Sequence, residues 1–236
     1  MNRSILLVFA HPDDESSGVS GTVKKYTEQG VPVDLITATR GEKGSRLDVP
    51  DDMETGAIRE RELRAAAAIM GIRNIYLLGY MDAELYKADI NEVAGKIADI
   101  MRQVEPEIVI TFGPDGISGH TDHITMGKAA TRAFKKLAAE GKAPRKLYYV
   151  TIAASALPDA DEYGVATRPD KEIAIATDIS RYFDTKIKAL SAHRSQQDAR
   201  DLIEMFKEEE ASGLRLKEYL YLAIPRSRRK ETDLFE

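Results

Sequence analysis

The amino-acid sequence predicts an α/β fold in which helices cover both faces of a mostly parallel sheet. Short apolar runs alternate with longer helical patterns through the first two thirds of the chain, as in strand–helix–strand units. The chain has 236 residues, of which 43% are hydrophobic and 31% are charged, values ordinary for one soluble α/β domain. No internal repeat, low-complexity tract or linker interrupts it, so we expect a single domain over residues 1–236.

The first part of the chain supplies three expected strands and two expected helices. Residues 4–9 form a short apolar run typical of a buried strand, and the helical pattern at 15–29 ends at Gly30 and Pro32. A second strand is expected at 33–39, followed by a loop at 40–53 that is rich in Gly, Asp and Pro. A helix is expected at 55–70, with Gly71 as its stop, and a third strand at 74–78.

The alternation continues to about residue 151 and then becomes less regular. The pattern predicts a helix at 90–104, a strand at 107–112, a helix at 123–140 and a strand at 146–151. Beyond this point, residues 172–177 and 218–223 are typical of strands, and residues 180–192 and 199–210 are typical of helices.

Composition excludes several classes of function. A net charge of -5 with only 4 His argues against a nucleic-acid binder, which normally carries a strong basic excess. The chain has no cysteine, which excludes disulfides, thiolate zinc sites and thiol nucleophiles, so any metal must be held by His and carboxylates. No apolar run approaches the length that spans a bilayer, and the run at 5–10 is too short for a secretory core. We therefore expect no membrane partner and a cytoplasmic location.

Two polar motifs follow two of the expected parallel strands. Ala-His-Pro-Asp-Asp-Glu at 10–15 comes directly after the first strand, and Gly-His-Thr-Asp-His at 119–123 follows the fourth. Both open a helix, at the sheet edge where open α/β proteins place their ligands. Each motif alone has a structural explanation, in which Pro fixes a turn and Asp or Thr caps a helix. That explanation gives no reason why three of the four histidines and two adjacent carboxylates should gather at one edge of the sheet.

Metal-assisted hydrolysis accounts for these residue types. A catalytic zinc takes three protein ligands from His and carboxylate and keeps a fourth position for water. Two nitrogens and one oxygen are available from His11, Asp14 and His123. Asp13 would then be the general base for that water, and His120 would donate to the oxyanion that forms when water attacks an amide. Asp122 would hold an imidazole in the required tautomer, as carboxylates behind metal ligands do.

These motifs resemble those of the LmbE-like (PIG-L) N-acetylglucosaminyl deacetylases. The resemblance continues in Gly-Thr at 21–22, Arg-Glu-Arg-Glu-Leu at 59–63, Leu-Gly-Tyr-Met-Asp at 78–82 and Ala-His-Arg-Ser-Gln at 192–196. It spans most of the chain, and the joint pattern is highly specific. It implies a Rossmann-like three-layer α/β/α fold, one zinc per chain, a small-molecule amino-sugar substrate and a homo-oligomer. Because the ligands are only nitrogen and oxygen, iron(II) or cobalt(II) could replace the zinc.

The resemblance also assigns roles by motif position. His11, Asp14 and His123 match the metal ligands of the family, Asp13 its general base and His120 its electrophilic stabiliser. Residues that match or lie near sugar-binding positions are Arg59, Asp82 and His193. Each has a structural alternative: a pair with Glu62 for Arg59, a turn for Asp82 and a buried structural histidine for His193. Ser118 stands where some relatives carry a mobile Tyr, so tyrosine-assisted oxyanion stabilisation from that position is absent.

The implied activity is zinc-dependent removal of the acetyl group from an N-acetylglucosamine-type amino sugar or its glycoside. An amidase acting on a larger thiol–sugar conjugate would use the same chemistry, and the segments 40–53 and 153–171 are expected to set that choice. A non-catalytic, metal-stabilised sugar-binding protein would need neither Asp13 nor His120. A nucleotide-dependent enzyme is not expected, because the first strand–helix turn lacks Gly-x-Gly-x-x-Gly and holds acids where phosphates need bare N–H groups.

Overall fold

The structure is a computed structural model that describes residues 3–142, 144–212, 216–225 and 229–236. The strands in this part of the chain are β1 (Ile5–Phe9), β2 (Val33–Thr39), β3 (Asn74–Tyr80), β4 (Ile108–Phe112), β5 (Lys146–Thr151), β6 (Ile175–Asp178) and β7 (Lys217–Ile224). The α-helices are α1 (Asp14–Thr27), α2 (Thr55–Met70), α3 (Ile90–Val104), α4 (Gly116–Gly119), α5 (Thr121–Ala139), α6 (Phe183–Ala192) and α7 (Gln197–Ala211). Short 3-10 turns lie at η1 (Leu85–Lys87), η2 (Ala160–Tyr163), η3 (Asp170–Glu172) and η4 (Ser180–Tyr182).

The strands form one sheet in the order β3-β2-β1-β4-β5-β7-β6. The pairs among β1 to β5 are parallel, whereas β7 runs antiparallel to both of its neighbours, β5 and β6. The predicted α/β fold with a mostly parallel sheet is therefore confirmed. The less regular pattern after residue 151 corresponds to the part of the sheet where the strand direction reverses.

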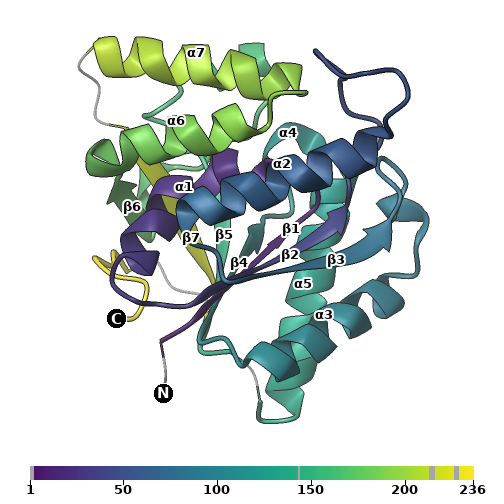
Figure 1. Cartoon of the computed structure of the whole chain (residues 1–236). Coiled ribbons are helices and arrows are strands. Elements are labelled where there is room, and N and C mark those ends of the chain that lie inside the picture. The colour runs from purple at the N-terminus through teal and green to yellow at the C-terminus, as the bar shows by residue number, and fades with distance from the viewer. Residues whose placement is uncertain (1–2, 143, 213–215, 226–228) are drawn as a thin grey trace.

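Helices cover both faces of the sheet. α3 and α5 lie together on one face, and α1 and α2 lie on the other (Figure 1). α6 packs mainly on α1 and α2, and α7 packs on α6, so this side carries a further helical layer (Figure 1). No helix in the described part of the chain has the length and apolar character to cross a membrane.

β1 and β4 form the centre of the sheet, and every residue of both strands is buried. A strand that is flanked on both edges and covered on both faces has no solvent-facing side, which explains its continuous apolar run. Each fully buried Leu or Ile of this kind contributes about 1.5–3 kcal/mol to folding. The two strands therefore form a rigid base for the loops that follow them.

The chain order reverses between these two central strands. From β1 the chain passes to β2 and β3 on one side, and it later places β4 and β5 on the other side. Open α/β sheets bind their ligands at the carboxyl ends of the strands at such a switch point. β1 ends at Phe9 and β4 ends at Phe112, so both histidine-containing motifs follow strands that meet at this point.

Two element boundaries differ from the prediction in ways that affect the site. The helix expected at 123–140 begins at Thr121, because His120 is its N-cap and accepts a hydrogen bond from the Asp122 N–H at 3.2 Å. β3 continues to Tyr80, past the predicted end at 78, and Asp82 follows shortly after it. Both differences come from side-chain and strand-pairing contacts that hydrophobic periodicity does not report.

Candidate active site

The turn after β1 folds the Asp14 carboxylate back over the backbone. Asp14 Oδ2 accepts hydrogen bonds from the N–H groups of Ala10 and His11, at 3.0 and 2.7 Å. Asp13, the N-cap of α1, has a φ of 118°, a conformation that costs a non-glycine residue about 1–3 kcal/mol. Strain of this kind persists only where the surrounding contacts impose it. The turn thus directs the two adjacent carboxylates to different partners.

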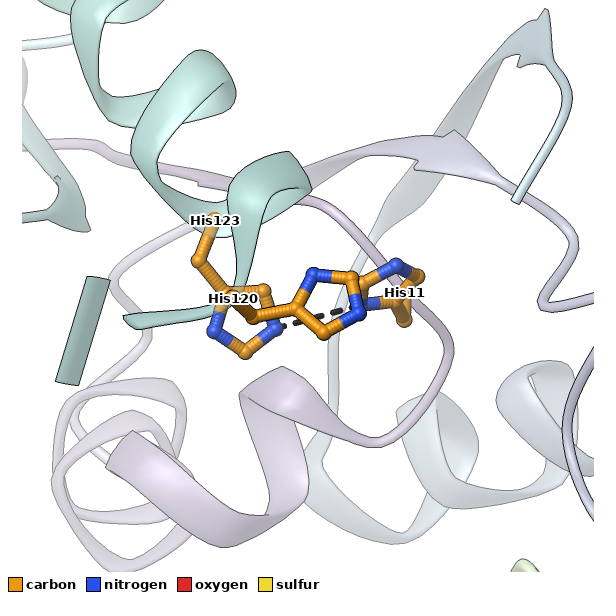
Figure 2. A group of neighbouring side chains, drawn as sticks. All are labelled: His11, His120 and His123. Atoms are coloured by element: carbon orange, nitrogen blue, oxygen red, sulfur yellow. Dashed lines mark hydrogen bonds between the residues drawn. The ribbon is translucent and has the colours of Figure 1, made fainter. Parts of the chain in front are cut away.

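Three side chains from both motifs converge beside this turn. His11 Nδ1 lies 3.1 Å from His123 Nε2, the contact drawn as a dashed line in Figure 2. The Asp14 carboxylate completes the group, with Oδ1 at 3.3 Å from His123 Nε2 and Oδ2 at 3.8 Å from His11 Nδ1. The structure therefore brings the three predicted metal ligands together, from the end of β1 and the start of α5.

The outer nitrogens of both imidazoles already have acceptors. His11 Nε2 lies 3.1 Å from Asp82 Oδ1 and 3.4 Å from Asp122 Oδ2, and His123 Nδ1 lies 3.0 Å from the Gly116 carbonyl oxygen. An outer N–H donated to such an acceptor fixes the tautomer and leaves the inner nitrogen with a lone pair. With both rings neutral in this tautomer, two lone pairs and the Asp14 carboxylate would be available to a bound metal ion.

This donor set fits a zinc ion. Nitrogen ligands about 2.0–2.1 Å from a tetrahedral zinc lie about 3.3 Å apart, close to the 3.1 Å between the two inner nitrogens. The electrostatics also favour a cation. Burial alone would lower the pKa of His11, but hydrogen bonds to Asp122 and Asp82 and the charge of Asp14 raise it to about 10. Burial alone would raise the pKa of Asp14, but His123 and His11 hold it below its usual range.

The ligand atoms of His11, His120 and His123 also lie within 4.8 Å of one another, and a further set of possible ligand atoms lies on the other side of His11. The ligand atoms of His11, Asp82 and Asp122 are within 4.8 Å of one another, and all three residues are buried. The carboxylates in this set already accept backbone hydrogen bonds, Asp82 Oδ2 from Lys43 N–H at 3.0 Å and Asp122 Oδ2 from Ala83 N–H at 2.8 Å. We assign these carboxylates to hydrogen bonds behind His11, because both lie at its Nε2 whereas its Nδ1 faces His123.

Asp13 adjoins Asp14 in the same turn, and its side chain is partly exposed, 24% accessible. Arg59 on α2 donates to Asp13 Oδ2 at 2.8 Å and to the Pro12 carbonyl oxygen at 2.6 Å. Burial raises the pKa of Asp13 to about 6, opposed by the Arg59 charge and reinforced by that of Asp14. A carboxyl with this pKa can take and return a proton near neutral pH.

His120 packs edge-on against His11, with ring centroids 4.7 Å apart, and tilted against His123 at 4.9 Å (Figure 2). Its Nδ1 accepts the Asp122 N–H, so a neutral ring carries its proton on Nε2. Burial and the charges of His11 and His123 lower the pKa of His120, which favours this neutral form. His120 is thus a half-buried N–H donor beside the three converging side chains.

The three predicted substrate contacts are all buried and turned toward other site residues. Arg59, 4% exposed, donates to Asp13, Pro12 and the Gly41 carbonyl oxygen, and not to Glu62 as the structural alternative proposed. Asp82 holds His11 Nε2, which together with neighbouring contacts lowers the pKa of Asp82 to about 2 against the effect of burial. In the structure both side chains therefore make contacts that support the centre, and their sugar contacts stay predictions.

His193 differs most from the prediction, because its side chain has no exposed surface. Its Nε2 lies 3.3 Å from Glu15 Oε1 and 3.3 Å from Ser16 Oγ, below the first turn of α1. Glu15 Oε2 in turn accepts the Asp13 N–H at 3.2 Å. In this structure His193 therefore supports the strained turn, in keeping with its structural alternative, and a direct substrate contact by His193 stays a prediction.

Several supporting groups were missed by sequence reasoning. Glu15 was visible as the third acid of the first motif, although its pairing with His193 was not. Glu62 accepts from the backbone and hydroxyl of Ser195, at 2.9 and 2.7 Å, which joins two segments of the resemblance. The Gly116 carbonyl that orients His123 has no sequence signal, because every residue carries a carbonyl group.

Comparisons with known proteins point to one family. Residues 6–134 match the family model described as GlcNAc-PI de-N-acetylase (PIG-L), and this stretch includes both motifs. The chain is 38% identical over 203 residues to "Probable N-acetyl-alpha-D-glucosaminyl L-malate deacetylase 2" of Bacillus cereus, covering 84% of this chain and 86% of that protein. It is 34% identical over 235 residues to "1D-myo-inositol 2-acetamido-2-deoxy-alpha-D-glucopyranoside deacetylase" of Acidothermus cellulolyticus, covering 83% of this chain and 80% of that protein.

A solved structure shows the same arrangement of the chain. N,N'-diacetylchitobiose deacetylase from Pyrococcus horikoshii, complexed with its inhibitor MPG, superposes with a TM-score of 0.69 at 25% identity. The match covers 93% of this chain and 83% of that one. The predicted resemblance is confirmed: the chain belongs to the GlcNAc-PI de-N-acetylase (PIG-L) family of deacetylases.

Proposed function

We propose that this deacetylase removes the acetyl group from an N-acetylglucosaminyl glycoside, with zinc held by His11, Asp14 and His123. One observation carries the proposal. The inner nitrogens of two imidazoles and one carboxylate converge within 3.1–3.8 Å, while the outer nitrogens are occupied by acceptors. Iron(II) or cobalt(II) would fit the same nitrogen and oxygen ligands.

When bound there, zinc would polarise the amide carbonyl and ease deprotonation of water. Asp13 takes a proton from the attacking water, since Arg59 fixes its Oδ2 at 2.8 Å and leaves Oδ1 to act as the base. The same carboxyl then returns the proton to the leaving amine. His120 donates a hydrogen bond from its Nε2–H to the carbonyl oxygen as that oxygen gains negative charge.

The substrate class is inferred from what the relatives share. The three proteins described above are named for an N-acetylglucosaminyl malate, an N-acetylglucosaminyl inositol and a chitobiose. These compounds share an N-acetylated glucosamine and differ in the group attached to it. We infer the shared sugar for this chain and assign choice of the attached group to the segments 40–53 and 153–171. We also expect the protein to assemble as a homo-oligomer, as the family resemblance implies.

A deacetylation screen tests this proposal. Zinc-loaded protein is incubated with N-acetylglucosamine, its phosphate, its malate and inositol glycosides, and N,N'-diacetylchitobiose, and acetate and free amine are measured separately. We expect equal amounts of both products from at least one glycoside, lost with a chelator and restored by zinc. Asp13→Asn protein, prepared identically, controls for contaminating hydrolases.

The alternatives give different results in the same screen. Full zinc occupancy and sugar binding without product from any compound would support a non-catalytic binding protein. Turnover confined to a thiol–sugar conjugate added to the panel would support the amidase. Either result would refute the deacetylase proposal.

A further inference from the structure

The first helix of the chain is broken near its start. Val19 has φ -144° and ψ 15°, outside the helical region, although α1 continues on both sides of it. In an unbroken helix the Gly21 N–H would donate to the Ser17 carbonyl four residues earlier. Here the N–H groups of Gly21 and Thr22 donate instead to the Glu218 carboxylate on β7, at 3.0 and 2.7 Å. At the break, two N–H groups of the helix thus donate to a side chain on a distant strand.

The carbonyl groups before the break receive a cation. Lys186 Nζ, from α6, donates to the Ser17 carbonyl oxygen at 2.6 Å and lies 3.4 Å from that of Ser16. The same ammonium donates to Glu218 Oε1 at 3.1 Å. The ion pair therefore stands inside the helical ladder, between the carbonyl of Ser17 and the amide of Gly21. A side chain inserted into this ladder is an established cause of sharp helix kinks.

Protein encloses both charged side chains, which are only 2% and 3% exposed. α1 packs tightly at this point, because a Cβ on Gly21 would lie 2.5 Å from Cγ2 of Ile179. A buried ion pair adds little net stability over well-packed apolar side chains, since desolvation offsets the attraction. The contribution of Lys186 and Glu218 is therefore best sought in the geometry that they impose on α1.

The segment before the break carries the two carboxylates of the centre. Asp13 caps α1 and Asp14 is its first residue, so both belong to the turn whose carbonyls Lys186 holds. We propose that Lys186 and Glu218 are positioning residues that set the direction of this first turn and so place Asp13 and Asp14 at the metal centre. This inference rests on the proposed function for the roles of Asp13 and Asp14.

Two variants of the full chain test the proposal, with a matched control. Lys186→Met removes the ammonium and keeps most of the side-chain length, and Glu218→Gln keeps the volume but removes the charge and one acceptor. The control is Lys146→Met. Lys146 pairs with Glu231 at 2.8 Å, with exposed fractions of 7% and 8%, at the first residue of β5 and so at the opposite end of the parallel strands.

We expect Lys186→Met to lower zinc affinity and kcat about 10- to 100-fold each, the range for groups that orient a metal site, with KM little changed. Amide hydrogen exchange at residues 14–18 should accelerate at least about tenfold, because the turn loses its tether. Glu218→Gln should change the same quantities in the same direction by smaller factors. Lys146→Met should lose stability but keep wild-type zinc affinity, kcat and exchange at 14–18.

The proposal is wrong if folded Lys186→Met protein matches the control in zinc affinity, kcat and exchange at 14–18. Should Lys186→Met not fold, the nearly isosteric Glu218→Gln decides on the same three quantities. Zinc binding and amide exchange require no substrate. A wild-type protein that releases no acetate would therefore refute the proposed function and leave this test intact.

Discussion

Asp82→Asn separates the role that the structure indicates from the sugar contact that the sequence predicted. Both Asp82 oxygens are occupied: Oδ1 lies 3.1 Å from His11 Nε2, and Oδ2 accepts the Lys43 N–H at 3.0 Å. An amide has one acceptor oxygen and an NH₂ group. The substituted side chain would therefore place its NH₂ group against the N–H of either His11 or Lys43, so that two donors face each other.

The size of the effect follows from that mismatch. Losing a hydrogen bond that involves a charged group costs about 1.5–3 kcal/mol, or roughly 10- to 150-fold in an equilibrium constant. Replacing groups behind a metal ligand usually lowers metal affinity about 10- to 100-fold, which agrees. We expect Asp82→Asn to weaken zinc binding within this range, and to lower activity at limiting zinc, while KM at saturating zinc stays within about twofold.

The assay is a competitive chelator titration for zinc affinity, followed by kinetics at saturating zinc. Glu84→Gln is the matched control, because Glu84 follows Asp82 in the same loop and pairs with the Lys43 ammonium at 3.1 Å without contacting His11. Wild-type zinc affinity in Asp82→Asn together with a raised KM would refute this reasoning and support the sugar contact.

Three further predictions follow from the site. Asp13→Asn should retain zinc and lose about 10²–10⁴-fold in kcat. Because the base must be ionised, the wild-type rate should rise with pH through a pKa at or below about 6. This rise at acidic pH should disappear in the variant. His120→Ala should lose about 10²–10³-fold in kcat, and any fall of the rate at high pH should persist in this variant, since a neutral His120 has no proton to lose in that range. His193→Ala should lower the melting temperature and kcat but leave KM unchanged, because the ring is buried against Glu15; a raised KM at normal stability would contradict this placement.

Periodicity predicted the elements well where burial follows a regular pattern. The expected helices at 55–70 and 90–104 and the strands at 33–39 and 146–151 have the same bounds in the structure. Gly71 ends α2 as predicted, with a φ of 82° that suits glycine. Boundaries shifted where a side chain decided them, as when His120 capped α5.

The positions of the two motifs were also predictable, because each follows a parallel strand and such strands end at one edge. Their partners were not. Arg59 lies 46 residues from Asp13 in the chain, and its choice of Asp13 over Glu62 depends on how α2 packs. The burial of His193 depends on α6 resting on α1, a contact between segments that are far apart in the chain. Nothing in a single sequence reports such packing.

The most direct test of the central claim is a zinc-edge anomalous difference map from a crystal of the zinc-loaded protein. We predict one strong peak, about 2.0–2.2 Å from His11 Nδ1, His123 Nε2 and an oxygen of Asp14, with Asp82 and Asp122 hydrogen-bonded behind His11. A peak on the Nε2 side of His11, coordinated by Asp82 and Asp122, would contradict the account and reverse the roles of the two sets.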